Sequence, residues 1–143
     1  MVKHFRDLRN YQFALKSAMI IFELTKKWPP EEHYSMTDQI RRSSRSVHAN
    51  IAEAWRKRRY VAHFTSKLCD ADGEAAETQS WLDSAFRCGY ITEDTFNRLN
   101  NYYELICGGL VLMINDAAAW CQMPTIVKEM EPEYHIEESL NAG

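Results

Sequence analysis

The sequence predicts an all-α protein, an antiparallel up-down-up-down four-helix bundle. Three observations support this fold class. Apolar residues recur in alternating steps of three and four over four long segments, the connections between these segments are short, and strand-like alternation is almost absent. Steps of three and four place side chains on one face of a helix, and short connections favour antiparallel neighbours.

The first helix is expected over residues 8–27. Its apolar seam is predicted to consist of Leu8, Tyr11, Leu15, Ala18, Phe22 and Thr25. The segment Trp28-Pro29-Pro30 ends this helix. Proline lacks an N–H donor and disfavours helical geometry in the residue before it.

The second helix is expected to begin near Ser35. Ser35 and Asp38 have the spacing of a capping box, with aspartate in place of the usual glutamate. Its buried stripe is predicted to contain Ile40, Ser43, Ser44, Val47, Ile51 and Ala54.

The third helix follows a basic turn and ends before Gly89, which has the position of a C-cap glycine. Its predicted seam is Val61, Phe64, Leu68, Ala71, Ala75, Thr78, Leu82 and Ala85.

Thr92 is expected to cap the fourth helix. The predicted seam of the fourth helix is Phe96, Leu99, Tyr103, Ile106, Leu110, Met113, Ala117 and Trp120. Gly108-Gly109 inside it predicts a close helix crossing or a kink.

The 143 residues suit one domain, with the bundle over residues 1–122 and an acidic tail over residues 123–143. The tail has five glutamates and only Lys128 as a basic residue, a net charge of −4 within a total of −3. We expect this polar segment to be loosely ordered. One hypothesis is that it folds over the basic face described below and screens it.

Several classes of protein are disfavoured by the sequence. No segment approaches the roughly 20 apolar residues of a membrane helix, and the charged N-terminus lacks a signal-peptide core. The expectation is therefore a soluble cytoplasmic protein without a membrane partner. The four cysteines form no C-x-x-C motif and are interpreted as small hydrophobic residues: Cys69, Cys88, Cys107 and Cys121.

The motifs of common enzymes are also absent. The sequence has no G-x-S-x-G, no phosphate-binding glycine loop and no dinucleotide fingerprint. A di-iron bundle needs Glu-x-x-His pairs, and none of the five histidines has an acid three residues before it. We therefore expect no catalytic residue, no metal and no cofactor.

The strongest functional signal is a cluster of basic residues on or just after the second helix. Its seven members are Arg41, Arg42, Arg45, Arg56, Lys57, Arg58 and Arg59. On a helical wheel the four helical arginines fall opposite the core. One hypothesis is sequence-independent binding of RNA or DNA backbone. The alternative is a structural assembly or protein-interaction module whose arginines pair with acids of the third helix or of another subunit.

Two polar residues, Asn50 and Glu53, lie on the flank of the second helix's seam. A partly buried polar group needs a hydrogen-bonding partner. We expect one of them to bond into the third helix near Glu77, or to a basic residue such as Arg42. Their predicted role is to set the register between helices.

Two blocks of residues resemble the four-helix bundle proteins, also called 23S rRNA intervening-sequence proteins. The first block consists of Phe5, Leu8, Pro29, Glu32, Gln39, Ile40, Arg41, Arg42, Ser46, Val47, Asn50, Ile51, Ala52 and Glu53. The second runs through residues 71–77, 81–82 and 88–91. Ala54-Trp55 replaces the glycine that usually follows the N-I-A-E element.

This resemblance extends over residues 5–120 and implies a bundle that assembles into a ring-like pentamer without established catalytic activity. A related group of bundles serves as accessory factors of retroelement reverse transcriptases and binds nucleic acid on a positive surface. The resemblance thus implies the chain itself as a partner, together with RNA or DNA.

Overall fold

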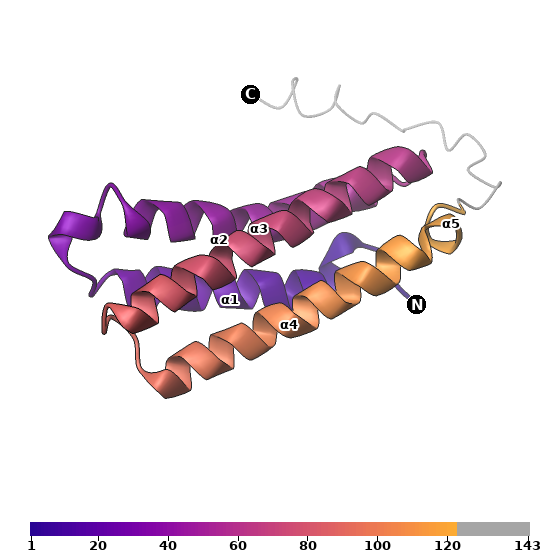
Figure 1. Ribbon diagram of the computed structural model, residues 1–143. Helices are drawn as coiled ribbons and strands as arrows, with labels where there is room; N and C mark the ends of the chain where they lie inside the picture. The colour runs from indigo at the N-terminus through magenta and orange to yellow at the C-terminus, as the bar shows by residue number, and fades with distance from the viewer. Residues whose placement is uncertain (123–143) are drawn as a thin grey trace, which may run out of the picture.

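The computed structural model describes residues 1–122, which contain four long helices and no strand. These are α1 (Arg9–Thr25), α2 (Met36–Arg56), α3 (Val61–Arg87) and α4 (Glu93–Asn115) (Figure 1). Short helices complete the fold: η1 (Phe5–Asp7), η2 (Pro30–Glu32) and α5 (Ala117–Trp120). The predicted all-helical class is confirmed. The expectations for residues 123–143 lie outside the described residues.

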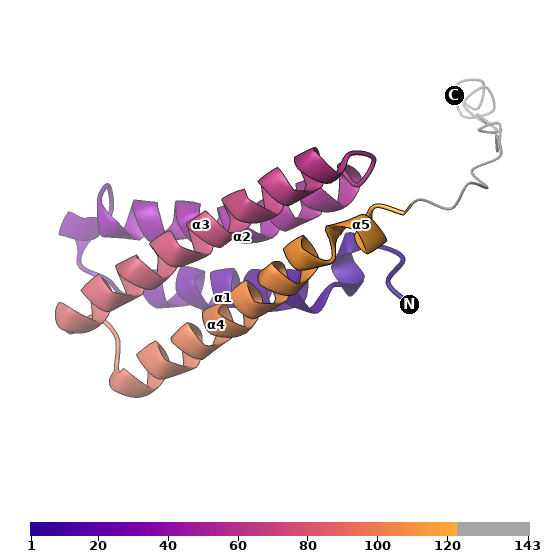
Figure 2. The same cartoon turned by 45° about the vertical axis from the view of Figure 1, so that its right-hand side comes forward.

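The long helices form a closed bundle. Each packs against the next in sequence, and α4 packs against α1 (Figures 1 and 2). The α1–α2 and α3–α4 connections lie at one end of the bundle. The N-terminus, the α2–α3 turn and α5 lie at the other end. None of the helices in residues 1–122 is both long and apolar enough to cross a membrane.

The predicted seams of α2, α3 and α4 form the core almost as expected. The predicted stripe of α2 is buried throughout, and in α3 only Val61 is exposed, at 46%. In α1 the prediction that Leu15 belongs to the core was wrong, because Leu15 is 38% exposed. The inward positions of α1 include Ala14, Ser17 and Ile21. These residues are partly small or polar, so hydrophobic spacing alone favoured Leu15.

Two of the three predicted helix caps are confirmed. Gly89 has a φ of +76°, the left-handed conformation that follows many helix C-termini. The Thr92 hydroxyl accepts the N–H of Thr95 at 3.2 Å. The capping box at Ser35 does not form. The Glu32 carboxylate instead accepts the N–H of Met36 at 3.3 Å, because η2 brings it within reach of the helix start.

The two glycines of α4 have different surroundings, although the helix runs through both without interruption. A Cβ on Gly109 would lie 3.3 Å from the Cβ of Asn10 in α1, whereas a Cβ on Gly108 would meet nothing within 4 Å. The predicted close crossing therefore involves Gly109 and not Gly108.

Gly108→Ala is expected to stabilise the protein by about 1 kcal/mol, because alanine is a better helix former than glycine. Gly109→Ala should gain less or destabilise, since Asn10 must move to admit the new methyl group. Urea unfolding at one fixed protein concentration measures both changes. Gly73→Ala in α3 is a control, because it also meets nothing within 4 Å. Equal gains at all three positions would contradict the close crossing.

Candidate nucleic-acid interface

The structure separates the seven predicted cations into two groups. α2 ends at Arg56, so Lys57, Arg58 and Arg59 lie in the turn before α3 and not on the helix. Arg41, Arg42 and Arg45 lie in the first half of α2, towards the opposite end of the bundle. The single basic face expected from the helical wheel is therefore two distinct sites.

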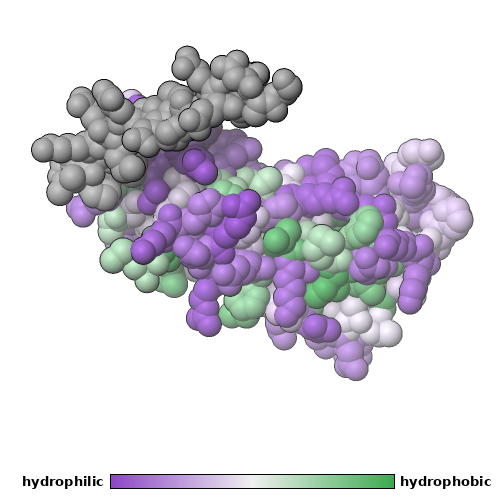
Figure 3. All heavy atoms as spheres, turned by 180° about the vertical axis from the view of Figure 1, so that it is seen from behind, coloured by the Kyte–Doolittle hydropathy of each residue, from purple (hydrophilic) through white to green (hydrophobic). Residues whose placement is uncertain are grey.

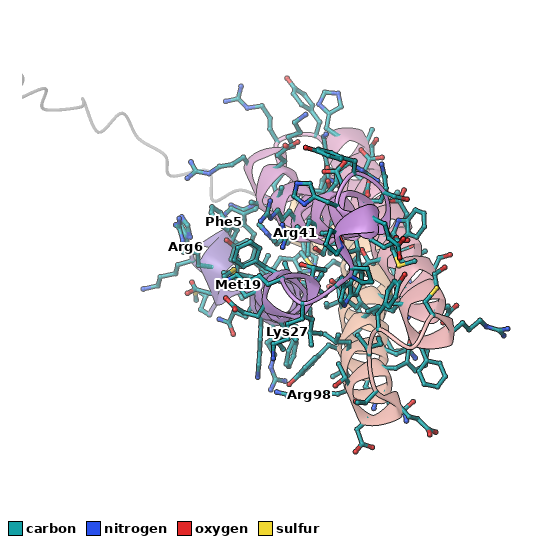
Figure 4. All side chains as sticks on the ribbon, turned by 90° about the vertical axis from the view of Figure 1, so that its left-hand side faces the viewer. Phe5, Arg6, Met19, Lys27, Arg41 and Arg98 are labelled. Carbon is teal, nitrogen blue, oxygen red and sulfur yellow. The ribbon has the colours of Figure 1, made fainter. Side chains whose placement is uncertain are left out.

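Arg41 and Arg45 both lean towards α1. Their guanidinium carbons lie 4.9 and 5.5 Å from the centre of the Phe22 ring. The Nε of Arg41 also donates to the Thr25 hydroxyl at 2.8 Å. Seen along the bundle, Arg41 and Met19 lie at the boundary of α2 and α1 (Figure 4). Both guanidinium groups thus converge on one aromatic ring.

Arg42 leans the other way, towards α3. One of its terminal nitrogens lies 3.3 Å from the Glu74 carboxylate, and the other pairs with Glu77. This matches the interpretation of the arginines as partners for acids of the third helix. Because its charge is already paired, Arg42 is a poor candidate for phosphate binding.

Polar contacts align α2 with α3 along one antiparallel register. The Glu53 carboxylate lies 2.9 Å from the Lys67 ammonium, and its hydrogen bond and charge raise the pKa of Lys67. The buried Thr78 hydroxyl donates to the Ser43 hydroxyl at 2.9 Å. Glu53 therefore does bond into the third helix, but at Lys67 and not near Glu77.

Of the two residues, Glu53 forms the expected bond into the third helix and Asn50 does not. The side-chain amide of Asn50 donates to the Ser46 carbonyl of its own helix at 2.9 Å. It forms no hydrogen bond with a residue of α3. Glu77 is occupied by Arg42 and by the indole N–H of Trp81 at 3.4 Å. Of the predicted structural polar residues, Glu53 and Glu77 thus link helices and Asn50 does not.

Arg41 and Arg45 border a groove of about 750 Å³ between α1 and α2. Its α1 wall includes Leu15 and Met19, which is 52% exposed. Burial, followed by the charge of Arg45, lowers the pKa of His48 in this groove. Viewed from behind, the molecule shows apolar patches framed by hydrophilic side chains (Figure 3).

The second group of cations lies at a hollow of about 630 Å³, which we call the basic end. It is lined by Lys3, His4, Trp55, Arg56, Lys57, Arg58, Arg59, Tyr60 and His63. η1 packs against α2 and so brings the N-terminal residues to the α2–α3 turn. The Asp7 carboxylate accepts the N–H groups of Lys3 and His4 at 3.0 Å each, and these bonds lower its pKa. None of the lining residues is acidic.

The cations of the basic end have different roles. The guanidinium of Arg58 lies 3.5 Å from the centre of the Trp55 ring, and its Nε donates to the Trp55 carbonyl at 2.8 Å. Arg58 is thus held against the fold. Arg56, Lys57 and Arg59 are exposed, and none of them forms an ion pair within residues 1–122.

Backbone dipoles add to this positive charge. α3 starts at the basic end, and its N-cap residue Tyr60 forms no side-chain cap. The N-terminus of a long helix carries a partial positive charge and attracts anions. This partial charge has the same sign as the side-chain charges of the basic end.

Sequence reasoning found four of the lining cations but missed Lys3, His4, Trp55, Tyr60 and His63. Tyr60 could have been found from the sequence, because it directly follows four basic residues. Lys3 had no local signal, because only the packing of η1 brings it there. Within the described part of the chain, no group of three His, Cys, Asp or Glu side chains is placed to hold a metal ion.

The fold and the basic end define a helical-bundle protein with an open cationic surface at one end. The chain belongs to the 23S rRNA-intervening sequence protein family, which matches residues 6–111. This confirms the resemblance seen in the sequence. A protein of unknown function from the S23 ribosomal protein family of Bacteroides thetaiotaomicron has a similar crystal structure. It is 34% identical with a TM-score of 0.67, over 74% of this chain and 95% of that chain. No curated protein matches the chain.

Proposed function

We propose that this protein is a non-catalytic binding protein that holds the phosphate backbone of RNA or DNA at the basic end. The observation that carries the proposal is the convergence of Arg56, Lys57 and Arg59, exposed and without ion pairs in residues 1–122, on a hollow with no acidic residue. Lys3 adds a further charge from a distant part of the sequence. Phosphate contacts of this kind position a nucleic acid without reading its bases.

The affinity for a single-stranded oligonucleotide is expected to fall as salt rises. Each neutralised phosphate contributes a slope of about −0.7 to the plot of log affinity against log salt. Three engaged cations therefore give a slope of about −2, measured by fluorescence anisotropy from about 0.05 to 0.2 M salt. An affinity that does not respond to salt would rule out phosphate binding.

A second candidate function is self-association, favoured by two complementary surfaces. α4 exposes Leu105, Val111 and Leu112, the last at 71%. Glu104 and Asp116 line the same surface region as Leu105 and Leu112. The α1–α2 groove offers the opposite net charge, because Arg41, Arg42 and Arg45 outnumber Asp38 in its lining, beside its own apolar wall. Contact between two different surfaces of identical chains produces rings or filaments. In this proposal the arginines of α2 serve subunit contacts, as in the ring that the family resemblance implies.

Replacing Arg41, Arg42 and Arg45 together by glutamine separates the two roles. We expect a lower molar mass by light scattering and an almost unchanged salt slope, because these arginines lie away from the basic end. Leu112→Glu on the other surface should have the same effect on mass. An intact oligomer with a flattened salt slope would instead assign the groove arginines to nucleic acid.

A further inference from the structure

The basic end presents an aromatic side chain that phosphate binding does not need. Tyr60 is 58% exposed, stands directly before α3 and lines the same hollow as Arg56, Lys57 and Arg59. Its backbone is held on both sides. Its N–H donates to the Lys57 carbonyl at 3.3 Å, and its carbonyl accepts the N–H of Phe64 at 3.0 Å. A large ring is thus carried on a held backbone at the surface, outside the core.

The contact between the Tyr60 ring and its neighbour His63 leaves most of the Tyr60 side chain accessible to solvent. The rings of Tyr60 and His63 meet edge-to-face, with centres 5.2 Å apart and planes at 65°. The indole ring of Trp55, which also lines the hollow, is 6% exposed and already covered by Arg58. Of the tyrosine and tryptophan rings of the basic end, Tyr60 therefore has the more open one.

We propose that the basic end takes single-stranded nucleic acid, with one unpaired base stacked on Tyr60 and the flanking phosphates on Arg56, Lys57 and Arg59. This inference rests on the proposed function and names its substrate class. Proteins that hold single strands combine a positive surface with aromatic rings on which bases stack. A base inside a duplex is covered by its neighbours and offers no face to Tyr60.

The size of the hollow agrees with this ligand. Its volume of about 630 Å³ lies in the range of about 300–1,000 Å³ that is usual for small-molecule sites. Arg56, Lys57, Arg59 and Tyr60 in its lining are exposed, so a strand can reach the hollow from solvent. Stacking is tolerant of base identity, because every base has an aromatic face. The site is thus expected to distinguish strandedness and not sequence.

The test compares the full-length protein's affinity for an oligothymidylate with its affinity for an abasic oligonucleotide of equal length. The two probes carry the same phosphates, so phosphate binding alone gives equal affinities. With stacking, the base-bearing strand binds about 5- to 140-fold more tightly. Tyr60→Ala should remove this preference and leave affinity for the abasic strand unchanged. Tyr60→Phe should retain it, because stacking needs the ring and not the hydroxyl.

Tyr34 provides a matched control. It is 90% exposed and meets His33 edge-to-face at 4.6 Å, but it lies before α2, at the opposite end of the bundle. Tyr34→Ala should leave both affinities unchanged. A strand containing 2-aminopurine gives a second readout, with fluorescence quenched by the unmodified protein and not by Tyr60→Ala. Circular dichroism checks that each variant keeps its helices.

Different failures have different meanings. Equal affinity for the two strands overturns this inference and leaves phosphate binding intact. Equal losses from Tyr60→Phe and Tyr60→Ala, or a duplex that binds as tightly as the single strand, also overturn it. Binding of neither strand overturns the proposed function and this inference together.

Discussion

Replacing Arg56, Lys57 and Arg59 together by glutamine is expected to weaken binding of a single-stranded oligonucleotide about 100-fold at about 0.1 M salt. The estimate assumes one phosphate per cation and an electrostatic contribution that vanishes near 1 M salt. Each contact then contributes about 0.7 decade at about 0.1 M, and three contribute about two decades. The salt slope should fall by about two at the same time. Fluorescence anisotropy over a salt series measures both quantities.

Arg58 is left unchanged in this variant because its guanidinium packs on Trp55 and contributes to the fold. The control replaces Lys26, Lys27 and Arg87, which changes the net charge equally at the opposite end of the bundle. If this control weakens binding as much as the test variant, net charge and not the basic end determines affinity.

Phe64→Ala is expected to lower the free energy of unfolding by about 3–5 kcal/mol. Phe64 is completely buried in the first turn of α3, among the largest side chains of the core. Its removal costs both the transfer of the ring from water and the cavity that remains, because the surrounding helices collapse only in part. Urea unfolding at fixed protein concentration gives the change, with an unchanged m-value expected.

Phe86→Ala is the matched control in the same helix. Phe86 is 39% exposed and stacks on Phe96 at 5.2 Å, so its loss should cost only about 1 kcal/mol. Equal losses of unfolding free energy for Phe64→Ala and Phe86→Ala would show that the face of α3 that includes Phe64 is not buried.

Local sequence signals predicted much of the fold correctly. Gly89 and Thr92 act on the backbone next to them, so their roles as caps needed no knowledge of other helices. Ser35 failed as a cap because its backbone, with φ −124° and ψ −110°, lacks the extended conformation typical of an N-cap, and Glu32, brought near by η2, accepts the N–H of Met36 instead. Leu15 failed as a core residue because α1 packs through smaller side chains, including Ala14. Both errors concern packing or backbone geometry that the spacing of residues along the chain does not contain.

The candidate site was predictable only in part. The basic run Arg56–Arg59 is contiguous in sequence, so it was found, whereas the assignment of Arg41 and Arg42 to the same surface depended on an idealised helical wheel. Long arginine side chains bend towards available partners, here Phe22 on one side and Glu77 on the other. A wheel gives the direction of the Cα–Cβ bond and not the position of the guanidinium group.

By itself, the sequence determined four helices, their order and most of their buried faces, because periodicity and capping act within a few residues along the chain. The family was recognisable from the motif residues that resemble it. Only the tertiary structure decided which cations are already paired and which converge. Ion pairs, stacking and the hollow of the basic end depend on distances between segments far apart in sequence, such as Lys3 and His63. Those distances are set by packing of the whole bundle, and no local pattern contains them.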